Sequence, residues 1–333
     1  MVTIAYGVAI LFMVLLPLIF AFSLVRKYGV GWTVFMLGGV AFLVAEIVRS
    51  FATNWLTGTE FFINATTGLT PVYVIMIYAL LISLFYTAAR YAGFRLAGAQ
   101  GGSSWGGAMT VAAGFATLNV VLIFGLNALM TLVYALTFPS TAPDGVAAAE
   151  FATMQQQIAD FWNLSFISAV VQSQLIPGLW QFTLQFAITM IVWVGMVSES
   201  GQWVKIKFFD ITMNVWVGVV QKKWLWIFSA FLLQTAMVAV YSVVSNWMLI
   251  YLVNAQEFSI NFFLGTFIFL VMMAFNVGIV YVLFKKVKPL VPEFVRVVPA
   301  PLTAKPGEKS LRAKEKPVQE VKPAKKLKNT DLK

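Results

Sequence analysis

Residues 81–98 read LISLFYTAARYAGFRLAG, an apolar run typical of a membrane-spanning helix, with Arg90 near its end. A charged side chain inside a membrane helix is unfavourable unless it finds partners or reaches the headgroups. Counted at the rise of an α-helix, Arg90 lies roughly 28 Å from Pro71, close to one membrane face. We therefore expect its long side chain to extend to the headgroups on that face.

The composition around this stretch is that of an integral membrane protein with many spans. Of the 333 residues, 60% are hydrophobic and 11% are charged, and the mean hydropathy is +0.84. A soluble domain of this size carries charge on about a quarter of its residues. Because lipid offers no partner to an open strand edge, the spans are predicted to be helices. The predicted fold class is an all-α, polytopic membrane bundle.

Hydropathy and the positions of Gly, Pro and basic pairs predict about eight membrane-embedded helices. They cover residues 2–25, 32–55, 72–97, 105–137, 177–198, 203–221, 225–252 and 262–284. A short surface helix is predicted over residues 146–159. Segment 203–221 either crosses the membrane or re-enters it, and the sequence leaves both alternatives open.

The charge is concentrated at the end of the chain. Residues 285–333 hold 14 Lys and Arg against 5 Asp and Glu, with many prolines. The sequence thus predicts two parts, a membrane bundle over residues 1–284 and a disordered basic tail over residues 285–333. Such a tail can bind anionic lipid, or it can serve only to keep the chain soluble.

The basic residues of the short loops predict the orientation. Arg26, Lys27 and Arg95 lie on one side, whereas loops 54–71 and 138–176 carry only acidic residues. We therefore expect the N-terminus outside, and a re-entrant segment 203–221 would leave the tail cytoplasmic. The expected location is the plasma membrane of a prokaryote, with membrane lipids and a transmembrane protein as candidate partners and no nucleic acid.

The chain contains no histidine and no cysteine. This excludes Ser-His triads, histidine general bases, thiolate nucleophiles and metal sites that need imidazole. Any metal site would have to consist of oxygen ligands, and too few are suitably placed for tight divalent binding. We expect no cofactor, no catalytic residue and no metal.

Polar residues inside the predicted helices mark a candidate cavity. Glu46 and Arg49 are three residues apart and close enough to pair. Glu46 lies roughly 22 Å in from Gly31, so we expect it at a different depth from Arg90, and Arg90 is not expected to be its partner. The candidate binding residues are Tyr86, Arg90, Phe115, Asn119, Gln181, Gln185, Asp210 and Asn214. The alternative is that these residues only hydrogen-bond between helices and fix their packing.

Several of these stretches resemble the YhfC-like intramembrane protease family, relatives of the CAAX-processing proteases. MLGGVAFLVAEIVRS, residues 36–50, is similar to the family's second helix. SLFYTAARYAGFR, residues 83–95, is similar to its Glu-Glu-x-x-Arg-Tyr helix, but Tyr86 and Thr87 stand where the two glutamates are expected. The resemblance extends over roughly residues 1–284.

The other motifs of the resemblance are altered in the same way. GFATLN keeps Gly114 of a Gly-His-Gly-Gly-x-Glu motif but has Phe115 for the histidine and Asn119 for the glutamate. DITMN has Asp210 in place of the histidine of a His-x-x-x-Asp/Asn motif and keeps Asn214. The resemblance implies that a glutamate pair beside the arginine activates water in the family, and these substitutions remove that chemistry.

Three functions stay open on the sequence. The first is a non-catalytic membrane protein on a protease-like scaffold that binds a partner helix or lipid, or serves as an accessory subunit. The second is a transporter or channel with a polar central cavity, against which stands the absence of an inverted repeat. The third is a membrane hydrolase with chemistry unlike the family's, using Glu46 and Asp210.

Overall fold

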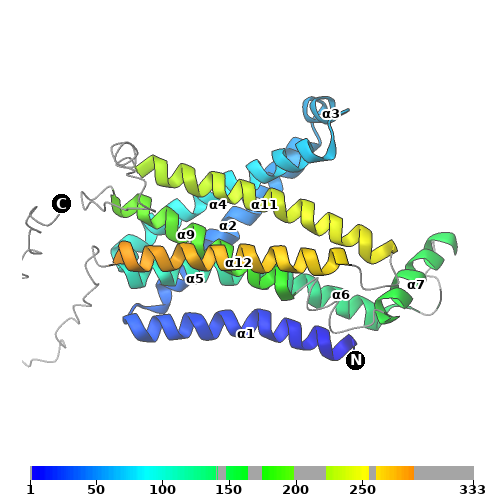
Figure 1. The fold of residues 1–333 in the computed structure, drawn as a ribbon, viewed down its shortest axis with the longest axis horizontal. Coiled ribbons are helices and arrows are strands. Elements are labelled where there is room, and N and C mark those ends of the chain that lie inside the picture. The colour runs from blue at the N-terminus through cyan, green and yellow to red at the C-terminus, as the bar shows by residue number, and fades with distance from the viewer. Residues whose placement is uncertain are drawn as a thin grey trace, which may run out of the picture. The chain divides into compact units, whose positions relative to one another are not determined.

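The computed structural model describes residues 2–139, 141, 148–163, 175–198, 223–254 and 260–288, all within one compact unit (Figure 1). Every regular element in these ranges is helical. The long helices are α1 (Val2–Tyr28), α2 (Trp32–Thr57), α4 (Pro71–Ala97), α5 (Trp105–Asn119), α6 (Leu126–Thr137), α9 (Ile176–Ser198), α11 (Lys223–Asn254) and α12 (Ile260–Lys286). The other helices are α3 (Glu60–Thr66) and α7 (Ala148–Asn163), and the latter corresponds to the predicted surface helix.

The polytopic membrane bundle predicted from the sequence is confirmed. Within the described ranges, seven helical stretches are long and apolar enough to cross a membrane, counting α5 and α6 as one. The predicted segments agree with these helices to within a few residues. Segment 203–221 lies outside the described residues, as does the predicted tail beyond residue 288.

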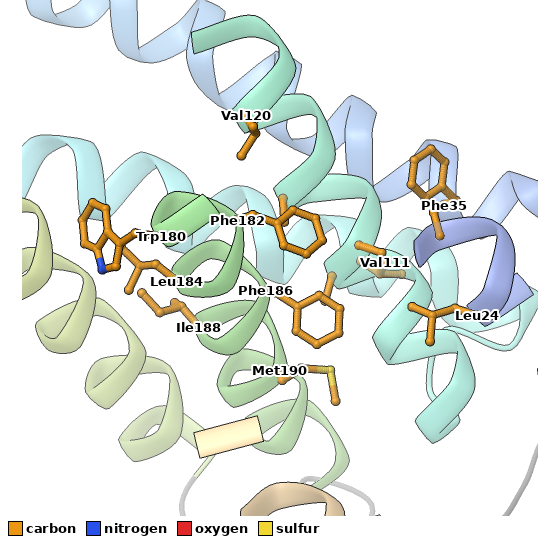
Figure 2. Close-up of a cluster of buried hydrophobic side chains, with 14 of the residues drawn as sticks. Leu24, Phe35, Val111, Val120, Trp180, Phe182, Leu184, Phe186, Ile188 and Met190 are labelled. Atoms are coloured by element: carbon orange, nitrogen blue, oxygen red, sulfur yellow. The ribbon is translucent and has the colours of Figure 1, made fainter. Parts of the chain in front are cut away.

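Helix α9 forms the centre of the bundle. It packs against α4, α5, α11 and α12. Of its most apolar stretch of 18 residues, 83% is buried, compared with 22–39% of the corresponding stretches in the other spans. Figure 2 shows how it fills both sides: Trp180, Leu184 and Ile188 leave one side, and Phe182 and Phe186 leave the other. Both rows follow the spacing of four that aligns side chains on one helix face. A helix surrounded in this way can carry polar groups that never meet lipid.

Helices α2 and α5 approach each other through glycines. A Cβ atom on Gly38 would overlap the carbonyl group of Val111, and one on Gly114 would overlap the carbonyl oxygen of Phe35. Small residues at such crossings let two membrane helices come into backbone contact. The glycine retained at position 114 therefore has a packing role, and this contact places Phe115 against α2.

A tight connection joins α4 to α5. The 3-10 turn η1 (Gly98–Gln100) leads to Gly101, whose φ of 91° is left-handed and suits glycine. Ser104 then caps α5 by accepting a hydrogen bond from the backbone N–H of Gly107 at 3.0 Å. The connection folds α5 back along α4, so that Arg90 and Phe115 can meet.

The single helix predicted over residues 105–137 is interrupted. Between α5 and α6 the chain forms one π-helical stretch, η2 (Val120–Gly125), which begins directly after Asn119. Short π-helical stretches inside α-helices often occur at functional sites. Periodicity alone could not reveal it, because the residues of η2 are as apolar as their neighbours.

The two helices that flank residues 199–222 meet the same end of the bundle. In Figure 1, α9 ends where α11 begins, beside the end of α12. The chain thus leaves and rejoins the described helices at one end.

Candidate functional site

Arg90 lies at the centre of the bundle and is completely buried. Its guanidinium group donates hydrogen bonds to three side chains on two other helices. Nε donates to Thr189 Oγ1 at 2.9 Å, one Nη donates to Gln185 Oε1, and the other donates to Gln234 Oε1. Helix α4 therefore places a cation among acceptors supplied by α9 and α11.

The expectation that Arg90 extends to the headgroups is wrong. The distance from Pro71 to Arg90 along α4 gives the position of Arg90 in its own helix. It does not show which side chains of other helices lie beside it. Gln185 and Thr189 are four residues apart on α9 and present two acceptors on the face that meets α4. With Gln234 as a third, these partners remove the need to reach water.

Two aromatic rings cover the remaining faces of the guanidinium group. Its Cζ lies 4.4 Å from the centre of the Phe115 ring and 5.9 Å from that of Tyr86. Phe42 completes the cluster, and the three rings meet edge to face with centroids 5.4–5.8 Å apart. Cation–π contacts of this kind are worth about 2 kcal/mol when desolvated. Phe115 thus serves as a platform for Arg90.

Glu46 reaches the same cluster from the other side. It accepts a hydrogen bond from the Tyr86 hydroxyl at 2.8 Å and forms the predicted ion pair with Arg49. The described partners of Glu46 are thus Arg49 and Tyr86 and not Arg90, as expected, although Tyr86 lies on the same helix as Arg90. Glu46 is fifteen residues from Gly31, and Tyr86 is fifteen residues from Pro71. Both therefore lie near the middle of their helices, where α2 and α4 cross.

Of the remaining candidate residues, Gln181 and Asn119 lie within the described part of the chain. Gln181 is buried and accepts a hydrogen bond from Gln185 Nε2 at 2.9 Å, which extends the network of Arg90. Asn119 is also buried, but its Oδ1 has no partner among the described residues, and the same holds for Thr87 Oγ1. Asp210 and Asn214 lie outside the described residues.

Sequence reasoning missed Thr189 and Gln234 as partners of Arg90. Thr189 continues the Gln181–Gln185 row at a spacing of four, which was a usable signal. Gln234 shares a predicted helix face with Tyr241 and Ser245, but nothing in its own sequence neighbourhood indicated α4 as its partner.

The groups around Arg90 stabilise a cation. The atoms that contact Arg90 are amide oxygens, a hydroxyl and aromatic rings, none of which is a base near neutral pH. Among the described residues, no carboxylate contacts Arg90, because Glu46 is engaged by Arg49 and the Tyr86 hydroxyl.

Comparison with known proteins agrees with the motifs. No curated protein and no solved structure matches the chain. The sequence model of the family described as YhfC intramembrane metalloprotease matches residues 12–209, more than half of the chain. This region contains α2, α4, α5 and α9, which bring Glu46, Tyr86, Arg90 and Phe115 together. The chain belongs to the YhfC intramembrane metalloprotease family.

Proposed function

We propose that this protein is a non-catalytic member of its family, an intramembrane-protease scaffold that binds a membrane partner or lipid without cutting it. The observation that carries the proposal is the environment of Arg90. At the positions where the family motif has two glutamates and a histidine, this chain places Tyr86, Thr87 and Phe115. Two of these three side chains pack their rings on the guanidinium group, which is a structural role.

The family's description implies a catalytic metal, and the described residues do not fit one. No group of three His, Cys, Asp or Glu side chains occurs among them. The place nearest the altered motifs is occupied by a guanidinium cation between amides and rings, which would repel a divalent ion. The oxygens of Thr87 and Asn119, which have no partner among the described residues, are neutral and too few for tight binding.

The orientation of the scaffold follows from charge. Arg26, Lys27, Arg95, Lys285 and Lys286 lie in the last turns of α1, α4 and α12, which finish at one end of the bundle (Figure 1). Excess Lys and Arg mark the cytoplasmic side of a membrane protein. The proposed arrangement has the N-terminus outside and the tail in the cytoplasm of a prokaryotic cell.

A packed interior favours binding over transport. The buried polar side chains around Arg90 are bonded to one another, so they join α4, α9 and α11 and leave few free groups to lead a solute through. The described part of the chain gives no specific support to a channel, and a binding role is therefore preferred.

Asp210 provides the test, because it is the carboxylate that stands in a family motif. The variant Asp210→Asn keeps the shape and removes the charge. In proteoliposomes carrying a labelled transmembrane substrate, we expect no hydrolysis by the wild type above protein-free vesicles. We expect the variant to change only thermal stability or the recovery of bound partners. Hydrolysis by the wild type that Asp210→Asn abolishes in a normally folded variant would overturn the proposal.

A further inference from the structure

A second feature of the bundle is a cavity on its side, away from Arg90. It has a volume of about 390 Å³ and is bounded by α1, α5, α9 and α12. Its walls are mostly aromatic: Phe20, Trp105, Phe182, Phe186, Tyr281 and Phe284. This volume lies within the range of pockets that hold small molecules or a stretch of an apolar chain. We call it the lateral cavity.

Two buried polar atoms beside the lateral cavity lack partners among the described residues. Asn276 is fully buried, and its Nδ2 donates weakly to Thr183 Oγ1 at 3.4 Å, while its Oδ1 is unpartnered. Trp105 is 2% exposed, and its indole N–H is unpartnered. Both atoms belong to residues that line the lateral cavity but are themselves sealed from it, so the surface of the cavity is apolar and suits an apolar occupant.

The lateral cavity runs from the middle of the membrane to a basic end. Asn276 and Phe284 are eight residues apart on α12, which is about 12 Å along the helix, and Trp105 packs on Phe284 with ring centroids 5.9 Å apart. At that end, Lys285 Nζ lies 4.8 Å from the Tyr281 ring centre and Lys288 Nζ lies 4.6 Å from the Phe284 ring centre. Both rings line the cavity, so two cations stand at its mouth.

The walls favour a lipid chain over a partner helix. Transmembrane helices pack closely through Gly, Ala, Ser and Thr, as α2 and α5 do here. The lateral cavity instead presents bulky rings around a space, which suits a narrow apolar chain. The cations at its mouth suit a phosphate.

We propose that the lateral cavity binds one anionic phospholipid, with an acyl chain among the rings and the phosphate at Lys285 and Lys288. This inference extends the binding role proposed above. It concerns a cavity that shares no residue with the Arg90 network, so its failure would leave the non-catalytic proposal standing.

The experiment is native mass spectrometry of the full chain from detergent containing equal phosphatidylglycerol and phosphatidylcholine. We expect one retained phosphatidylglycerol per chain. Val277 lines the cavity and is 54% exposed, whereas Val271, on the same helix, is 51% exposed and is not among the lining residues. Val277→Trp should therefore abolish retention, and the matched Val271→Trp should preserve it.

The proposed binding of the phosphate is tested by removing the positive charges at the mouth of the cavity. Lys285→Gln/Lys288→Gln should lower the preference for phosphatidylglycerol over phosphatidylcholine roughly tenfold, because basic residues near the surface attract anionic headgroups. The control Arg26→Gln/Lys286→Gln removes the same charge at the same end and should change the preference less than roughly twofold. Equal retention of both lipids by the wild type, or equal losses in the matched tryptophan variants, would overturn the proposal.

Discussion

Replacing Gln185 and Gln234 together by leucine is expected to destabilise the bundle by about 3–6 kcal/mol, because a hydrogen bond to a charged group is worth about 1.5–3 kcal/mol. Both amides accept from the Arg90 guanidinium group, which is fully buried and has no other described route to water. The double variant leaves a buried cation with Thr189 and two rings. The measurement is unfolding in bicelles or a thermal shift in detergent.

Adding Arg90→Met to the same chain provides the control. Replacing a whole buried polar cluster by apolar residues of similar size is often neutral, whereas removing some of its members is not. Thr189 keeps a partner in the triple variant, because its hydroxyl donates to the backbone carbonyl of residue 185 at 2.6 Å, which the substitution leaves in place. We expect the triple variant to recover most of the lost stability. A triple variant as unstable as the double variant would show that the amides stabilise the bundle for a reason other than their hydrogen bonds with Arg90.

The second large effect is expected at Gly114. Gly114→Leu places a side chain where the backbone of Phe35 stands, so α2 and α5 must separate. Overpacking a core usually destabilises by about 1–3 kcal/mol, and overlap with backbone should reach or exceed the upper end of that range. Because this contact also positions Phe42 against Phe115, the variant should disturb the ring cluster around Arg90.

Gly278→Leu is the matched control for this prediction. A Cβ atom at Gly278 would meet nothing within 4 Å, and the residue lies on α12, away from the α2–α5 contact. The melting temperature of Gly278→Leu should stay close to that of the wild type. Similar losses in both variants would mean that close packing of α2 and α5 is not what Gly114 provides.

Much of the fold could be predicted from the sequence because the signals are strong and local. Runs of more than twenty mostly apolar residues, such as the one that ends at Arg26 and the one that begins at Pro71, define membrane helices, and lipid forces them to be helical. The family resemblance could also be seen in the sequence, in Arg90, Gly114 and their spacing.

The arrangement around Arg90 could not be predicted in the same way, because it depends on which helices cross. Distance along α4 placed Arg90 near a membrane face, yet α9 and α11 surround it with acceptors. Glu46 and Tyr86 meet only because α2 crosses α4 near the middle of both. A single sequence gives the position of each residue along its helix but not its neighbours.

The lateral cavity was hidden for a related reason. Phe20, Phe182 and Phe284 lie in three apolar helices, and their composition is that of ordinary lipid-facing residues. Only the packing of α1, α9 and α12 turns them into walls of one space. Asn276 was visible as a polar residue in mid-helix, but its unpartnered oxygen was not.

The metal content of the purified chain tests the central claim most directly. A relative that keeps the Gly-His-Gly-Gly-x-Glu motif, purified in parallel, is the positive control. After dialysis against a chelator and analysis by inductively coupled plasma mass spectrometry, we expect far less than one zinc ion per chain, because the chain has no His or Cys and Arg90 lies beside the altered motifs. One tightly held zinc ion per chain, as in the control, would contradict the non-catalytic account.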